Sequence, residues 1–158
     1  MDITLRQATV ADAPIVVRFN SLLAAETENK SLDQVLLRQG VEALLGNPSK
    51  GLYFLAELDG TVVGQTMITY EWSDWRNGTF WWIQSVYVAK EARGTGVFKA
   101  LFEHIHALAA GQPDVCGLRL YVDENNAGAR QTYERLGMKH SHYRMFEMDF
   151  VSSQDIEK

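Results

Sequence analysis

A short glycine-containing segment in the second half of the chain is the first candidate for chemistry. It reads Arg93-Gly94-Thr95-Gly96 and lies between an apolar, β-branched run ending at Val88 and a helical pattern starting at Val97. Glycines permit positive φ and close approach of backbone to a ligand, while the first N–H groups and the dipole of a helix attract an anion. Arg93 adds a charged donor at the rim. The sequence therefore predicts a pyrophosphate site in this loop and in the first helical residues, Val97, Phe98 and Lys99.

Two familiar phosphate-binding motifs do not match this segment. A Walker loop requires Lys-Ser/Thr directly after its glycines, and no such pair follows Gly96. A dinucleotide fingerprint requires a third glycine where this chain has Lys99. An ordinary tight strand-to-helix turn therefore remains open beside a phosphate site of another kind.

A second motif follows further along the chain. Residues 118–122 are typical of a strand, residues 123–126 of a turn and residues 127–136 of a short helix, which Gly137 would close in the left-handed conformation. The motif residues have the spacing Asn-x-x-Ala-x-x-x-Tyr-x-x-Leu-Gly and are Asn126, Ala129, Tyr133, Leu136 and Gly137.

The two motifs together resemble the GNAT superfamily of acetyl-CoA-dependent N-acetyltransferases. The loop at Arg93 is similar to that family's pyrophosphate loop, and residues 126–137 are similar to its second cofactor motif, which includes Asn126. The resemblance implies a mixed α/β fold with a central, mostly antiparallel sheet flanked by helices on both faces. It also implies acetyl-CoA as cosubstrate and a primary amine as acceptor. Phe98 replaces a small residue of the family pattern, so its side chain should point into the apolar face of the following helix.

The resemblance also assigns roles to residues outside the loop. The main chain of Val86, Tyr87 and Val88 would pair with the pantetheine arm as an added strand, next to a bulge in that strand. Tyr133 would protonate the leaving thiolate, since a phenol of pKa about 10 is still protonated at pH 7. The alternative for Tyr133 is a packing role only.

The group that removes the amine proton stays unassigned. Gln84 stands where many relatives carry a glutamate, and an amide cannot act as a base. The proton would leave through water, through Glu71 or Asp74, or through Glu26 or Glu28 at the end of the first helix.

The predicted acceptor is a small cationic amine. Trp72 and Trp75 lie in a polar connection, where their indoles could form a pocket wall with cation–π character beside Glu71, or else a core or dimer contact. Gln84 and Glu26 complete the candidate acceptor residues. The segment around these tryptophans also loosely resembles the polyamine acetyltransferase branch.

Two other functions remain open at this point. A non-catalytic acyl-CoA-binding or sensing module on the same fold is the first, because Gln84 removes the usual base. A nucleotide-binding protein whose loop merely resembles the motif is the second.

Composition limits the remaining choices. The chain has 158 residues, which suits one domain over 1–150 with a polar tail over 151–158. A net charge of −5 argues against nucleic-acid binding, and no apolar run approaches the ~18 residues of a membrane span. One cysteine, Cys116, excludes an internal disulfide and is expected to be buried, and the four histidines lack ligand spacing for a metal. No secretory signal is visible, so a cytoplasmic protein is expected, with a homodimer as a further expectation of the resemblance.

Periodicity predicts the elements that must position these residues. Strands are expected over 3–7, 52–58, 61–70, 79–88, 118–122 and 143–150. Helices are expected from a capping box at Thr9 to about Glu26, from a second box at Ser31 to near Gly46, and over 97–108 and 127–136.

Overall fold

The computed structural model describes residues 2–151, so all but the first residue of the expected tail over 151–158 lies outside the described chain. The described residues form two compact units, one reaching to Arg119 and the other beginning at Leu120.

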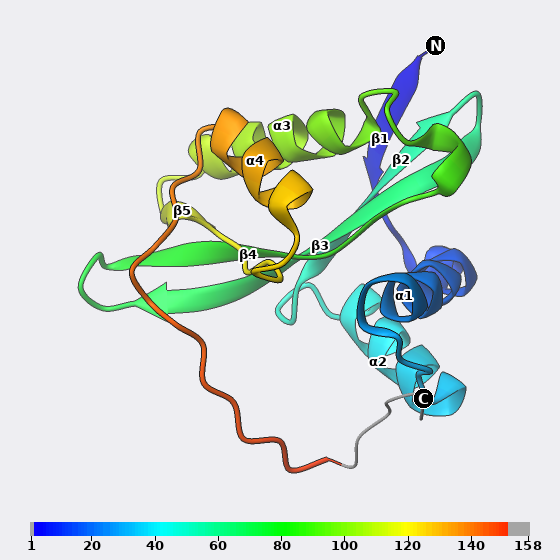
Figure 1. The fold of residues 1–158 in the computed structure, drawn as a ribbon, viewed down its shortest axis with the longest axis horizontal. Helices are drawn as coiled ribbons and strands as arrows, with labels where there is room; N and C mark the ends of the chain where they lie inside the picture. The colour runs from blue at the N-terminus through cyan, green and yellow to red at the C-terminus, as the bar shows by residue number, and fades with distance from the viewer. Residues whose placement is uncertain (1, 152–158) are drawn as a thin grey trace. The chain divides into compact units, whose positions relative to one another are not determined.

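A five-stranded sheet is the centre of the first unit (Figure 1). Its strands lie in chain order and are β1 (Ile3–Gln7), β2 (Leu52–Leu58), β3 (Thr61–Ser73), β4 (Gly78–Val88) and β5 (Val115–Arg119). The first three pairings are antiparallel, and only β4 and β5 run parallel. The mixed, mostly antiparallel sheet is therefore confirmed.

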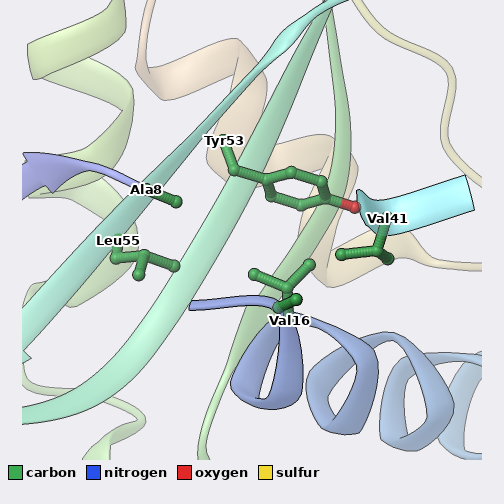
Figure 2. Packing of buried hydrophobic residues seen from close by; sticks show 6 residues of the cluster. Ala8, Val16, Val41, Tyr53 and Leu55 are labelled. Atoms are coloured by element: carbon green, nitrogen blue, oxygen red, sulfur yellow. The ribbon is translucent and has the colours of Figure 1, made fainter. Parts of the chain in front are cut away.

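Helices cover both faces of this sheet. They are α1 (Ala13–Glu28), α2 (Gln34–Leu45) and α3 (Val97–Ala110), with short 3-10 turns at Val10–Asp12 and Lys90–Ala92. Side chains alternate along a strand, so neighbouring residues of β2 meet different helices. Tyr53 packs in a buried cluster with Val16 of α1 and Val41 of α2 (Figure 2), whereas the ring of Phe54 lies 5.4 Å from that of His104 on α3.

Local chemistry explains the turns and helix starts. Asp59 and Gly60 both have positive φ, 50° and 80°, which joins β2 and β3 in the tight hairpin that an Asp-Gly pair predicts. The cap of α2 is Asp33 rather than the expected Ser31. Its carboxylate accepts from the backbone N–H of Val35 at 2.9 Å and of Leu36 at 3.1 Å. A carboxylate next to the first helical residue satisfies two otherwise unpaired donors.

A glycine allows α3 to lie close to the sheet. A Cβ placed on Gly64 of β3 would come within 2.8 Å of Cγ1 of Val97, the first residue of α3. Any larger residue would push this end of the helix outward. Gly64 therefore fixes the position of the N-terminus of α3 above β3 and β4.

The second unit contains α4 (Ala127–Arg135). Asn126 caps it by accepting from the N–H of Ala129 at 3.1 Å, and Gly137 ends it with φ +96°. Both predicted ends are confirmed within about one residue.

Three expectations about the region after α3 are wrong. The strand predicted over 118–122 is β5 at Val115–Arg119, because its pairing starts earlier, where the N–H of Thr79 donates to the carbonyl of Asp114 at 2.8 Å. Cys116 is exposed, since it lies on this short last strand of the sheet. Residues 143–150 are not a strand: they have no ladder partner among the described residues, and Phe146 and Phe150 are 94% and 91% exposed. An alternating pattern alone does not supply the second strand that a ladder needs.

Candidate functional site

The loop from Arg93 to Gly96 has the backbone that its glycines predict. Gly94 has φ +76° and Gly96 φ +90°, and a Cβ placed on either would meet no atom within 4 Å. Both glycines are thus required by conformation, and space is open beside them. The hydroxyl of Thr95 donates to the carbonyl of Ala92 at 2.5 Å, which closes the loop from its inner side.

The N-terminus of α3 follows this loop without a side-chain cap. Gly96 is the cap residue, and within residues 2–151 this helix start has no side-chain capping hydrogen bond. The N–H groups of Val97, Phe98 and Lys99 are those that a helix cannot satisfy internally. Phe98 is half-buried with its ring 6.4 Å from that of Phe102, so its side chain packs along the helix as expected. The arrangement can hold an anion.

Strand β4 carries a bulge just before this loop. Met67 of β3 pairs with Gln84, but the next pair is Gln65 with Tyr87, so two residues of β4 oppose one residue of β3. Ser85 lies at the bulge with φ +51°. Side chains of β3 replace the interrupted ladder, because Gln65 Nε2 donates to the carbonyl of Ser85 at 3.0 Å. The bulge that the resemblance implied is confirmed.

Beyond the bulge, one edge of β4 has no neighbour among the described strands. β5 pairs with β4 only from Thr79 to Trp82. The N–H of Ala89 donates to Val63 of β3, so by alternation the N–H and C=O of Val88, and those of Val86, face the other edge. Within the described strand pairings, both backbone groups of Val86 and the N–H of Val88 are available to an extended ligand, whereas the carbonyl of Val88 accepts from Nε of Arg93. Tyr87 points instead toward α1, with its ring 5.0 Å from that of Phe19.

Arg93 connects the strand, the loop and α1. Its Nε donates to the carbonyl of Val88 at 2.9 Å, and its guanidinium contacts Glu26 at 2.9 Å. Lys90 also approaches Glu26, at 3.3 Å. The hydrogen bond from Arg93, followed by that from Lys90, holds the pKa of Glu26 below its usual value. Glu26 is therefore a weak candidate for a base, and Arg93 shapes the site as well as adding charge to it.

Gln84 and Glu71 lie on one face of the sheet, the face that α1 and α2 cover elsewhere. Gln84 Nε2 donates to Oγ1 of Thr69 at 2.5 Å. Glu71 accepts from Nε1 of Trp82 at 2.8 Å and contacts Arg119 at 3.1 Å. These partners, Trp82 first, lower the pKa of Glu71. Its charge is thus already compensated within the sheet.

The structure does not bring the five candidate acceptor residues together. Trp72 neighbours Glu71 in β3 and so points to the opposite face, while Trp75 lies in the turn between β3 and β4. They are 61% and 86% exposed. A wall formed by both indoles and Glu71 has no support in this geometry.

Tyr133 and Asn126 belong to the second unit. Asn126 caps α4 through its side chain, and Tyr133 lies half-buried in the middle of that helix. Burial raises the pKa of Tyr133 above its usual value. The phenol therefore stays protonated throughout the neutral range, as a proton donor must.

Comparison with known proteins decides the family. The model of the acetyltransferase (GNAT) family matches residues 18–138, well over half of the chain. The chain belongs to the GNAT family. A possible acetyltransferase from Clostridium difficile 630 is 45% identical over 95% of this chain and 99% of that chain, with a TM-score of 0.88. The comparison with curated proteins finds no match.

More distant structures share the fold of this GNAT protein. A predicted acetyltransferase from Clostridium acetobutylicum, solved with acetyl-CoA, is 17% identical with a TM-score of 0.75 and covers 94% of this chain and 96% of its own. The ribosomal-protein-alanine N-acetyltransferase from Brucella melitensis biovar Abortus 2308 is 17% identical with a TM-score of 0.76, covering 95% and 100%. At such identities the likeness concerns the fold alone.

Acetyl-CoA is the cosubstrate of this family, and the residues present fit it. The open space at Gly94 and Gly96, with the uncapped end of α3, suits a pyrophosphate. The unpaired edge at Val86 and Val88 suits an amide-containing arm. Among residues 2–151 there is no cluster of three or more His, Cys, Asp or Glu that could hold a metal ion. In that same range no helix is long and apolar enough to cross a bilayer.

Sequence reasoning missed the residues that support the bulge. Gln65 is completely buried, and its Oε1 has no hydrogen-bond partner in the described structure. Thr66 donates from Oγ1 to the carbonyl of Gln84 at 3.3 Å. Two adjacent polar residues between the apolar residues Val62, Val63 and Met67, Ile68 are the signal that could have marked this place, because buried polar residues need partners.

Proposed function

We propose that this GNAT protein transfers an acetyl group from acetyl-CoA to the primary amine of a small molecule. One observation carries the proposal: the bulge at Ser85, the unpaired edge of β4 and the uncapped start of α3 follow one another along a single stretch of chain. Such a stretch can hold an extended ligand that ends in a pyrophosphate.

The loop, the end of β4 and Tyr133 have distinct roles in this proposal. The N–H groups from Gly94 to Lys99 hold the phosphates, and the main chain of Val86 and Val88 orients the pantetheine arm. Arg93 keeps the strand end and the loop together through the carbonyl of Val88. Acetyl-CoA, when bound, supplies the acetyl group as a thioester. The hydroxyl of Tyr133 delivers the proton that the sulfur requires as the C–S bond breaks and the N–C bond forms.

Neither Glu26 nor Glu71 takes the proton of the amine in this proposal. Gln84 is an amide, and hydrogen bonds lower the pKa of both glutamates: Arg93 and Lys90 donate to Glu26, and Trp82, followed by Arg119, donates to Glu71. We infer that the acceptor enters as the free base and that water takes its proton after the attack. A primary amine of lower pKa is then the better acceptor at neutral pH.

The test combines binding with turnover. Calorimetry should detect acetyl-CoA binding by the full chain, and a panel of amines scored by free-thiol release should give thiol in step with acetylated amine. Acetyl-CoA binding without amine-dependent thiol release would contradict the proposal and favour a non-catalytic acyl-CoA-binding module. Binding of ATP without binding of acetyl-CoA would indicate a nucleotide-binding protein instead.

A further inference from the structure

A cavity in the first unit reaches the bulge of β4 from the side of α1 and α2. We propose that it receives the uncharged, apolar body of a monoamine acceptor and that the amino group lies at Ser85. This inference rests on the proposed function. It narrows the acceptor from cationic amines in general to amines with one charged end.

The wall of this cavity is apolar. Leu37, Val41 and Leu44 line it from α2, and Met67 lines it from β3. The three α2 residues follow at helical spacing, so they form one face of the helix directed at the sheet. No charged residue lines the cavity. A second ammonium group would therefore lose its water without gaining a partner.

The inner end of the cavity is polar but neutral. Nδ2 of Asn20 donates to the hydroxyl of Tyr53 at 2.9 Å, and that hydroxyl is hydrogen-bonded to Ser85. Figure 2 shows the ring of Tyr53 extending from β2 with its oxygen beside Val41. Asn20 and Tyr53 are only 8% and 4% exposed. Asn20 turns its amide nitrogen toward this point, so the hydroxyls of Tyr53 and Ser85 are the neutral groups that can accept a hydrogen bond from the amino group.

The size of the cavity limits the acceptor. Its volume is about 220 Å³. At about 30 Å³ for each water-sized group, this space holds on the order of seven non-hydrogen atoms. Gly40 borders the cavity and is exposed, so the cavity also reaches the surface. An aliphatic amine of six carbons or an arylalkylamine has a suitable size, whereas a folded protein substrate does not enter.

The neutral surroundings also serve the reaction. Removal from water without a nearby carboxylate disfavours the charged form of an amine and lowers its pKa. Among the side chains that line the cavity there is no acidic group to oppose this effect. The cavity thus raises the fraction of free amine, which is the form that a chain with Gln84 in place of a glutamate needs.

The experiment compares two amines of equal length and atom count. Hexylamine ends in a methyl group, and cadaverine carries a second ammonium in its place. Binding is followed directly on protein with ¹³C-labelled methionine methyl groups, in which the Met67 signal is assigned by the Met67→Leu variant. We expect a saturable shift of this signal with hexylamine and at least tenfold weaker binding of cadaverine.

A matched pair of variants tests the location. A Cβ on Gly40 meets no atom within 4 Å, and Gly40 lies in a helix without positive φ, so substitution there is tolerated. Gly40→Phe fills the cavity and should weaken hexylamine binding at least tenfold with unchanged affinity for acetyl-CoA. Gly40→Ala should leave both affinities unchanged.

The outcomes separate the two proposals. Equal or tighter binding of cadaverine would overturn the assignment of the cavity, as would acetyl transfer to hexylamine with a Met67 signal that does not move. A Met67 shift that saturates without any thiol release from acetyl-CoA would keep the amine site and contradict the acetyl transfer.

Discussion

At the scale of single residues, the loop glycines carry the anion site through conformation. Gly96 has φ +90°, and the space beside it is empty, so a side chain there would occupy the room that a phosphate needs. Arg93, by contrast, is engaged with the carbonyl of Val88 and with Glu26. Its substitution by alanine should therefore disturb the strand end as well as remove charge.

Gly96→Val should weaken acetyl-CoA binding by more than tenfold, a loss above about 1.4 kcal/mol, because the side chain blocks the approach to the backbone N–H groups. Calorimetry measures this change. Gly60→Val is the control, since Gly60 also has positive φ and open space but belongs to the β2–β3 hairpin and not to the loop. Unchanged affinity in a folded Gly96→Val protein would remove the loop from the binding site.

Tyr133→Phe should lower kcat roughly 10²-fold with little change in acetyl-CoA affinity, because the ring stays and only the proton donor is lost. Steady-state kinetics with one good amine measure the effect. Tyr121→Phe, at an exposed tyrosine of the same unit, should keep the parental rate. A parental rate for Tyr133→Phe would mean that water protonates the sulfur and that the tyrosine only packs.

At the scale of elements, the sequence predicted features that depend on neighbouring residues, but it did not predict how the strands pair. The hairpin at Asp59-Gly60 and both ends of α4 follow from residues adjacent in sequence, and all are confirmed. The bulge at Ser85 depends on Gln65 of another strand, so the pattern of β4 alone could not locate it. Residues 143–150 alternate like a strand, yet no neighbour pairs with them in the part of the chain that is described.

The expected wall of Trp72, Trp75 and Glu71 is not formed, for a related reason. Trp72 and Glu71 are neighbours in sequence, but a pleated strand directs neighbours to opposite faces. The residues that do contact Glu71 are Trp82 of β4 and Arg119 of β5. The cavity could not be predicted from the sequence either, since its lining residues come from α1, α2, β2, β3 and the bulge of β4.

Packing of α3 over β3 gives a prediction at this scale. Gly64→Ala should lower the free energy of unfolding by about 1–3 kcal/mol, because the added methyl comes within 2.8 Å of Val97 Cγ1. Urea denaturation measures the loss. Val97→Ala should restore part of the stability in the double variant, since it removes Cγ1, the atom that the added methyl group approaches too closely. No recovery would indicate that the strand, rather than the helix contact, requires the glycine.

At the scale of the whole molecule, the distribution of charge sets the pH dependence of catalysis. Glu26 and Glu71 are each held by cations, and their lowered pKa values move any inflection from them further toward acid. The acceptor amine loses its proton only as pH rises toward its own pKa of about 10. The rate should therefore follow the amine and not the enzyme.

Log kcat/KM should rise with pH at a slope near one toward the pKa of the amine, without an inflection near pH 6 to 7. Two amines of similar shape and different pKa, measured over the same pH range, test this expectation. The control is the pH profile of acetyl-CoA affinity, which should be flat over the range used. A common inflection shared by both amines would reveal an enzyme base and contradict the role given to Gln84.

The uneven neighbours of β4 have a consequence for hydrogen–deuterium exchange. Its first half, around Trp81, is bonded to strands on both sides, whereas beyond Trp82 β4 pairs only with β3 among the described strands. Amide protons at Val86 and Val88 should therefore exchange quickly in the free protein, next to slowly exchanging ones at Trp81. A ligand that pairs with this edge would slow the exchange at these two valines. The exchange rates of these two amides, compared with that of Trp81, would then show whether a ligand is bound along β4.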